Sequence, residues 1–337
     1  MKYLHRTVGL TCLVISPSLI ANTEATEQET PFEPGWQFAL SANVGVGTEQ
    51  SQLNTHDDNK TTDSLQSSGK STSGFGVFPF VRVEYTLDNG HTQFYLGQSE
   101  DQVTDEQFQA EIGVNHYQDG LGLINAAYFP NIPGVNEVWE DAYVIGSARK
   151  TTNSNAQGGR IAFSPDTILP VTFRYAFVQY EVENDKSGKG QNLSAENMKK
   201  LERDSQYQRM GVETVVPLTD NMALLPALNY TIRNADGNAH SFKEFGGNLG
   251  LQASFGKHSF VAHAGIAQRG FDTKNPIFNQ KQDTTITNLF ALYSYAQPFG
   301  WKNASVSVIG GMGNEDSDIN FHDVESKYIS AGVNYLF

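Results

Sequence analysis

The side chains of this chain that could do chemistry are charged residues that recur at alternate positions within aromatic and aliphatic segments. In one such segment, Arg82 and Glu84 alternate with Val83 and Tyr85. A period of two is typical of a β-strand, in which successive side chains point to opposite faces. The charged side chains of each such segment therefore share one face, and the apolar side chains share the other.

The same alternation recurs along the chain from Trp36 to the C-terminal Phe337, with long polar stretches and short turns between the apolar segments. An apolar strand at the very end of a chain needs a partner, and a closed barrel supplies one because its last strand pairs with its first. We therefore predict an all-β fold, a transmembrane antiparallel up-and-down β-barrel. The pattern predicts about 14 strands, with 12 or 16 as alternatives.

A charge that faces lipid at the middle of a bilayer costs about 2–4 kcal/mol, so charged strand residues are expected to point into the barrel. They could form opposed basic and acidic walls that screen solutes, or they could pair into a plug that fills the barrel. Barrel size does not decide between these alternatives, although we favour a narrow channel. The expected pore-lining residues are Arg82, Glu84, Glu111, Arg160, Arg174, Arg209, Glu213, Arg233, Glu244, His263 and Arg269.

The N-terminus has the features of a secretory signal peptide over residues 1–21. Lys2 and Arg6 precede an apolar run, and the small residue Ala21 ends it. Cleavage after Ala25 is the alternative. The sequence thus predicts an exported protein.

The remaining chain divides into a short extension and one large domain. We expect residues 22–34 to form a periplasmic N-terminal extension and residues 35–337 to form the barrel. Within the loops, Ser194 precedes a short amphipathic segment and is predicted to cap a helix. Long loops are expected near residues 50–70, 130–157, 183–205 and 271–283.

The insertion near residues 130–157 carries three apolar clusters, which is unusual for an external loop. Apolar clusters favour a segment that folds back, either to cap the barrel mouth or to enter the pore. An additional hairpin is the alternative. The candidates for a constriction loop are Trp139, Glu140, Asp141 and Arg149.

Composition excludes several classes of protein. The formal net charge of −14 argues against nucleic-acid binding, which needs a basic surface. The single cysteine, Cys12, lies in the expected leader, so no disulfide or thiolate metal site is predicted. Two acidic segments, 56–60 and 314–320, lack the glycine and terminal glutamate of a calcium loop and are interpreted as solvated loops. We expect no metal and no cofactor.

No catalytic set emerges from the sequence. Ser259 and His263 share an inward face, but four residues along one strand separate them by roughly 13 Å, which is too far for a hydrogen bond. The common hydrolase and phosphate-loop motifs are absent from the sequence. The sequence therefore predicts that the protein is not an enzyme.

Four short motifs stand out in the loops: Asp58-Asn59-Lys60-Thr61, Ser68-Gly69-Lys70, Trp139-Glu140-Asp141 and Ala148-Arg149-Lys150. On these motifs the chain resembles an uncharacterised family of Gram-negative outer-membrane proteins, known only as domain of unknown function 2860. The resemblance implies a barrel in the cell outer membrane, in contact with lipid and lipopolysaccharide, and supplies no activity. The tail is similar to the C-terminal strand that the barrel-assembly machinery reads, with Tyr335 and Phe337 as the assembly signal.

These observations favour a porin-like passive channel for small polar solutes. The alternative is a closed barrel whose surface loops have a structural or adhesive role, and an outer-membrane enzyme ranks last. The sequence leaves the solute, the ion selectivity and the oligomeric state open.

Overall fold

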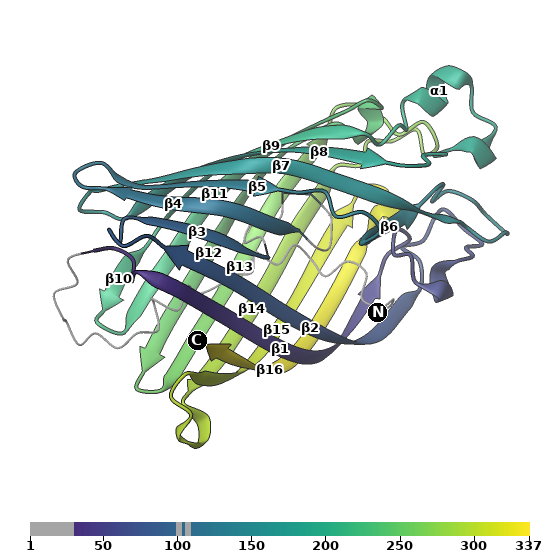
Figure 1. Cartoon of the computed structure of the whole chain (residues 1–337). Coiled ribbons are helices and arrows are strands. Elements are labelled where there is room, and N and C mark those ends of the chain that lie inside the picture. Colours follow the sequence, from purple (N-terminus) through teal and green to yellow (C-terminus); the bar gives the residue numbers. More distant parts are fainter. Residues whose placement is uncertain (1–29, 99–102, 105–108) are drawn as a thin grey trace.

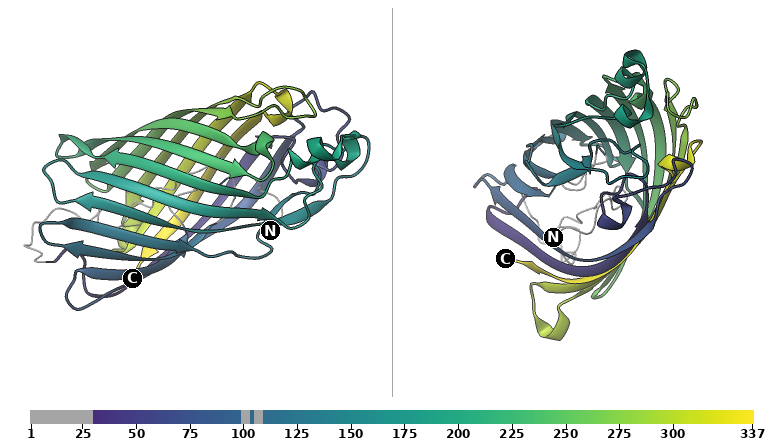
Figure 2. Two further views of the ribbon diagram at one scale, coloured as in Figure 1. Left: turned by 90° about the horizontal axis from the view of Figure 1, so that it is seen from above. Right: turned by 90° about the vertical axis from the view of Figure 1, so that its right-hand side faces the viewer.

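One antiparallel sheet curls round on itself to form a barrel (Figures 1 and 2). The structure is a computed structural model that describes residues 30–98, 103–104 and 109–337. The expected signal peptide lies outside the described residues and stays a prediction. The described end of the expected N-terminal extension contacts the turn between the second and third strands, where the Phe32 amide donates to the Gly90 carbonyl at 3.0 Å.

Fourteen strands form the wall, which confirms the predicted fold class. The short strand β6 pairs only with β7, and β10 pairs with β11 just beyond β9. The strands are β1 (Gly35–Gln50), β2 (Ser71–Thr86), β3 (Thr92–Gln98), β4 (Ala110–Gln118), β5 (Gly122–Phe129), β6 (Asn136–Trp139), β7 (Thr151–Pro165), β8 (Val171–Val182), β9 (Ser205–Thr214), β10 (Val216–Thr219), β11 (Met222–Ala235), β12 (Phe242–Phe255), β13 (His258–Phe271), β14 (Thr284–Ala296), β15 (Ala304–Ser317) and β16 (Val324–Leu336).

The first and last strands close the barrel. β1 pairs with β16 from Ala39, opposite Leu336, to Gln50, opposite Glu325. The amide of Phe337 also donates to the carbonyl of Phe38 at 2.9 Å. Because every wall strand pairs on both sides, the backbone hydrogen bonds that a bilayer core demands are made within the sheet.

Apolar side chains cover the outside of the barrel, as the alternation predicts. Trp36 is 62% exposed, Phe75 66% and Leu249 54%, although all three are large and apolar. On the same strand as Trp36, Ser41 and Asn43 are buried on the inner face. A continuous apolar exterior of this kind is what lipid contact requires.

Connection length distinguishes the two ends of the barrel. Short turns and both ends of the sheet, Gly35 and Phe337, lie at one end, which we call the turn end. The other end, which we call the loop end, carries the helix α1 (Ala195–Lys199) and strand β6 (Figure 1). Its long connections are 51–70, 99–109, 130–150, 183–204 and 272–283, and it also carries two short ones, 236–241 and 318–323.

Two expected loops are shorter in the structure than the sequence indicated. β7 begins at Thr151, inside the segment expected to be a loop up to residue 157, and β6 pairs with it as an additional hairpin. β15 continues to Ser317, so Glu315 lies on a strand and not in a solvated loop. Polar residues form the start of β7 and the end of β15, so apolar alternation alone predicts both strands too short.

The loops at the loop end pack on a shared apolar core, which we call the loop cap. Around it lie α1, whose expected cap Ser194 accepts a hydrogen bond from the amide of Asn197, and short 3-10 turns. No helix in the described ranges is long and apolar enough to cross a membrane. The buried residues of the loop cap are Leu65, Trp139, Ala142, Tyr143, Leu201, Ala239, Ile319 and Phe321. The 3-10 turns at the loop end are η2 (Asp57–Asn59), η3 (Lys189–Gln191), η4 (Asn238–His240) and η6 (Asn320–His322), whereas η5 (Pro298–Gly300) lies between β14 and β15 at the turn end.

Candidate functional site in the barrel interior

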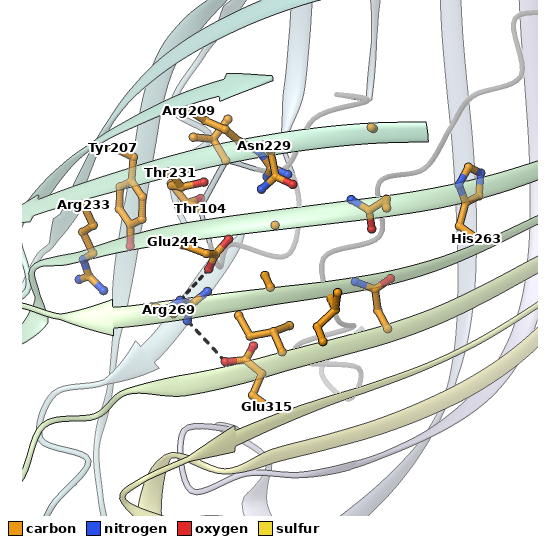
Figure 3. A pocket seen from close by; sticks show the side chains of 18 of the residues that line it. Thr104, Tyr207, Arg209, Asn229, Thr231, Arg233, Glu244, His263, Arg269 and Glu315 are labelled. Carbon is orange, nitrogen blue, oxygen red and sulfur yellow. Dashed lines mark hydrogen bonds and ion pairs between the residues drawn. The ribbon is translucent and has the colours of Figure 1, made fainter. Parts of the chain in front are cut away.

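A cavity of about 820 Å³ occupies the interior of the barrel. Its lining includes Trp139 and Tyr143 of the loop cap, and Asp166 and Pro170 of the turn that joins β7 to β8 at the turn end. Side chains of β9, β11, β12, β13 and β15 make up much of the wall between them (Figure 3). The cavity therefore extends from the underside of the loop cap towards the opposite end of the barrel.

The strand register places many charged residues on one face. Directly opposed residues of antiparallel neighbours share a face of the sheet. A single row of opposed residues crosses ten neighbouring strands of the wall, and we call it the charged row. It consists of Glu84, Tyr95, Gly113, Ala127, Arg160, Ala176, Arg209, Thr231, Glu244 and Arg269.

On the β2–β7 side of the barrel the charges are buried in pairs. Arg82 Nε donates to Glu84 Oε1 at 2.6 Å, and the guanidinium lies over the Tyr95 ring at 4.3 Å. Arg160 donates to Glu111 at 3.2 Å and to the Tyr95 hydroxyl at 3.2 Å. Glu111 is 0% exposed and Arg160 5%. This side of the interior matches the paired-charge alternative, and none of these four charged residues lines the cavity.

The charges on the β9–β15 side face the cavity. Arg269 lies between Glu244, at 2.8 Å, and Glu315, at 3.5 Å (Figure 3). Arg209 lines the same wall. Glu213 also lines the cavity and accepts a hydrogen bond at 2.5 Å from Arg174, which does not.

Six of the eleven expected pore-lining residues thus border the cavity, and five lie in the wall away from it. Among the six, His263 lies farther along its strand, apart from the arginines (Figure 3). Its Nε2 atom is buried and has no hydrogen-bond partner among the described residues. The six are Arg209, Glu213, Arg233, Glu244, His263 and Arg269, and the five are Arg82, Glu84, Glu111, Arg160 and Arg174.

Sequence reasoning missed several residues that line the cavity. Glu315 was assigned to a loop, although its alternation with Asn314 and Asp316 could have extended the strand. Arg203 lies in a loop, where no periodicity marks its direction. Neutral polar residues such as Asn229 and Asn248 also face inward, and the same alternation could have identified them.

The constriction-loop candidates Trp139 and Arg149 fasten the insertion to the first loop. The Trp139 indole donates to the Gln52 carbonyl at 3.1 Å, and Arg149 lies over the Trp139 ring at 4.5 Å. Arg149 donates to the carbonyls of Gln52, Ala142 and Asn59. Burial lowers the pKa of Arg149 to about 10, so the guanidinium stays charged at neutral pH.

The other two candidates, Glu140 and Asp141, hold the insertion to the β8–β9 loop. Glu140 pairs with Lys186 at 2.7 Å, and Asp141 accepts a hydrogen bond from the Gly188 amide at 3.1 Å. The insertion therefore lies across the mouth, and Trp139 and Tyr143 border the top of the cavity. Val103, between β3 and β4, also borders the cavity.

An ion pair between Arg203 and Asp185 fixes the β8–β9 loop, with the atoms 2.9 Å apart. Burial alone would raise the pKa of Asp185. The Arg203 guanidinium and the hydrogen bonds from Arg203 and Ser187 outweigh burial and hold that pKa below its usual value. Within the described ranges, no group of three or more His, Cys, Asp or Glu residues could hold a metal ion.

The closed antiparallel wall, the apolar exterior and the polar interior define this chain as a β-barrel of the outer-membrane type. Residues 35–336 match the family described as "Protein of unknown function (DUF2860)", and the chain belongs to that family. The resemblance inferred from the short motifs is thereby confirmed. No curated protein matches the chain.

Solved structures with a similar fold include three outer-membrane proteins. The outer membrane channel DcaP of Acinetobacter baumannii is 10% identical with a TM-score of 0.46, over 90% of this chain and 98% of that chain. The monoaromatic hydrocarbon channel CymD is 10% identical with a TM-score of 0.46, over 91% and 89%. A loop L8 deletion mutant of OmpT of Vibrio cholerae is 9% identical with a TM-score of 0.43, over 90% and 100%.

Proposed function

We propose that this protein is a passive channel of the outer membrane for small polar solutes, with the loop end outside the cell. The observation that carries the proposal is the cavity itself, because its lining includes residues at the loop cap and residues at the turn end. A barrel with a purely structural role has no need of such an interior space.

The lining suits polar solutes that keep part of their hydration. Arg209 and Arg269 face the cavity, with Glu244 and Glu315 beside them. Rings of charged side chains in a narrow lumen set a local field and exchange hydrogen bonds with passing solutes. The inward Asn229 and Asn248 add neutral donors and acceptors along the same wall.

Conductance through planar bilayers tests the proposal. The purified, refolded protein is expected to give discrete current steps in KCl. Proteoliposome swelling should then rank neutral sugars by size, because passage through a narrow lumen depends on solute radius. The absence of both current and swelling, with protein that is demonstrably folded, would contradict the proposal.

A second candidate, a closed barrel with a surface role, is favoured by the loop cap. The shared core draws residues from loops of β1–β2, β5–β7, β8–β9, β11–β12 and β15–β16. A cap of this extent could close the mouth permanently. In that case the barrel would serve as a platform for its loops.

A loop deletion discriminates between the two candidates. The Glu140 amide donates to the Lys150 carbonyl at 2.7 Å, so a two-residue linker in place of residues 141–149 should leave the β6–β7 hairpin closed. If the cap only narrows a channel, conductance should rise. If the cap seals the barrel, the wild-type protein should be silent, and current should appear only in the deletion variant. W139A serves as the milder companion, because it opens space above the cavity without shortening the chain.

A further inference from the structure

The part of the cavity just below the loop cap differs from the rest in its charge. We call it the upper chamber. Arg233, Arg203 and His240 line it, together with the rings of Tyr207 and Phe242. The Arg203 guanidinium pairs with Asp185 at 2.9 Å, whereas the Arg233 guanidinium has no carboxylate partner among the described residues.

Arg233 is the central cation of the upper chamber. Its Nε atom donates to Ser205 Oγ at 2.9 Å, and its Nη2 atom donates to the Arg203 carbonyl at 3.0 Å. Both acceptors are neutral, and within the described ranges Arg233 forms no ion pair with a carboxylate. No hydrogen bond in the described part of the chain uses Nη1, so the guanidinium retains donors for a ligand.

Arg233 contrasts with Arg269, which lies two strands away. Arg269 has carboxylates on both sides, at 2.8 Å and 3.5 Å. Arg233 is 9% exposed, so its charge is largely withdrawn from water without a carboxylate to balance it. A buried guanidinium gains most from a planar anion that accepts two parallel hydrogen bonds.

A second observation indicates that the chamber disfavours further positive charge. The His240 side chain is buried, borders the cavity, and leaves its Nε2 atom without a hydrogen-bond partner in the described ranges. Burial, and then the charges of Arg233 and Arg203, hold the pKa of His240 well below its usual value. The Asp185 carboxylate raises the pKa of His240, although the ion pair with Arg203 offsets the charge of Asp185.

The chamber walls are aromatic. Tyr207 and Phe242 are the direct register neighbours of Arg233 on the two adjacent strands, and its guanidinium lies 5.2 Å from the Tyr207 ring centroid. Tyr180 and Tyr143 border the same part of the cavity. Rings of this kind bind flat apolar groups by stacking and edge contacts.

From this geometry we propose that the upper chamber binds small aromatic carboxylates, with the carboxylate on Arg233 and the ring among Tyr207, Phe242 and their neighbours. The inference rests on the proposed channel function and specifies its substrate class. An anion without a ring would lose the contacts with the walls, and a ring without a negative charge would lose the guanidinium.

Ligand binding in detergent micelles tests this without any need for transport. Benzoate, benzyl alcohol and acetate are titrated separately into the folded protein, and binding is measured by calorimetry. Binding is also measured by the fluorescence of Trp139, in a variant in which Trp36 and Trp301 are replaced by Phe. We expect benzoate to bind at least tenfold more tightly than benzyl alcohol or acetate. Comparable binding of benzoate and benzyl alcohol, or no benzoate binding, would overturn the proposal.

Variants localise the site. R233Q should weaken benzoate binding at least tenfold, and R233K, which keeps the charge but not the planar fork, should give an intermediate loss. The matched control, R82Q/E84Q, removes an ion pair from the part of the wall that does not line the cavity, leaves the net charge unchanged, and should bind benzoate normally. Equal losses in R233Q and the control would overturn the assignment to Arg233.

Folding and transport are scored separately. Heat-modifiable migration on gels and circular dichroism establish that each variant is folded before binding is measured. If the protein conducts ions but does not bind benzoate, the proposed channel function stands and the proposed carboxylate site is contradicted. A protein that binds benzoate without conducting supports the site and contradicts the channel.

Discussion

At the scale of single residues, arginine side chains inside the barrel lie in two kinds of environment, buried in the wall or facing the cavity. Arg160 is paired with Glu111 in a fully buried contact, whereas Arg269 faces the cavity between two carboxylates. Burying an ion pair costs desolvation, so such a contact contributes little net stability while it is intact. Replacing only one residue of a buried ion pair lowers stability strongly, because the charge of the other residue loses the partner that offset its burial.

We therefore expect R160Q to lower the free energy of unfolding, by up to about 3–5 kcal/mol, since the buried Glu111 carboxylate would lose the guanidinium that lies 3.2 Å from it. Urea unfolding in lipid vesicles measures the change. The double variant R160Q/E111Q should recover a large part of the loss. If the double variant is as unstable as R160Q, the cost arises from packing and not from the loss of this ion pair.

For most strand residues, the sequence predicted whether the side chain points into the barrel or out of it. The period of two placed Arg82 and Glu84 on the same face, two residues apart, and the structure brings them to 2.6 Å. The partners of Arg233 were not readable, because Arg203 belongs to a loop. Which inward charges face water and which are buried also depends on residues from other strands, which no local pattern reports.

At the scale of elements, the loop cap joins segments that are far apart in the chain. Leu65 of the first loop and Phe321 of the last lie in the same apolar core. Tyr143 belongs to the same core, with its ring 5.1 Å from that of Phe321, and burial raises its pKa to about 12. Loops usually face water and carry polar residues, so a shared core of this kind indicates a fixed, ordered mouth. Sequence reasoning detected the apolar clusters of one insertion but could not predict the other loops that cover them.

The loop cap should loosen in mild acid because of His240. Its pKa lies well below the usual 6.5 in the folded protein, so below pH 6.5 the unfolded loop binds a proton that the folded loop does not. The stability of the cap is therefore complete above pH 6.5 and falls as the pH drops, by up to about 1.4 kcal/mol per pH unit. Arg233, Arg203 and His322 oppose protonation, and Asp185 favours it.

Hydrogen exchange of the loop amides between pH 7.5 and pH 5.5, corrected for the intrinsic rate, checks this expectation. The wild-type cap should lose protection on acidification. H240Q should show protection that varies little over the same range. A wild-type cap that is equally protected at both pH values would refute the role of His240.

At the scale of the whole molecule, closure of the sheet determines which side chains face the interior and which face outward. β1 and β16 are neighbours over most of their length, although they stand at opposite ends of the sequence. Closure fixes the inside and the outside together, so the apolar exterior and the charged interior follow from one strand alternation. The sequence predicted this closure from the apolar last strand and predicted 14 strands from the regular spacing.

The C-terminal residue should matter for assembly. Phe337 continues the β1–β16 pairing through its hydrogen bond with Phe38, and its ring lies 4.5 Å from that of Tyr335. We expect F337A to assemble in the outer membrane several-fold less efficiently, measured as the heat-modifiable fraction in cells. Refolding of the same variant into vesicles should be nearly normal, because the barrel wall itself is unchanged. Equal defects in cells and in vesicles would point to closure and not to recognition.

The central claim is that the inner face of the wall lines a water path across the barrel. Asn248 faces the cavity, whereas its neighbour Leu249 is 54% exposed on the outside. With the native Cys12 in the expected leader, N248C and L249C each carry one defined thiol in the mature chain. Single-channel conductance before and after addition of a charged, water-soluble thiol reagent compares the two faces. The structure predicts that the reagent reduces the conductance of N248C and leaves L249C unchanged, whereas equal effects on both variants, or none on N248C, would contradict it.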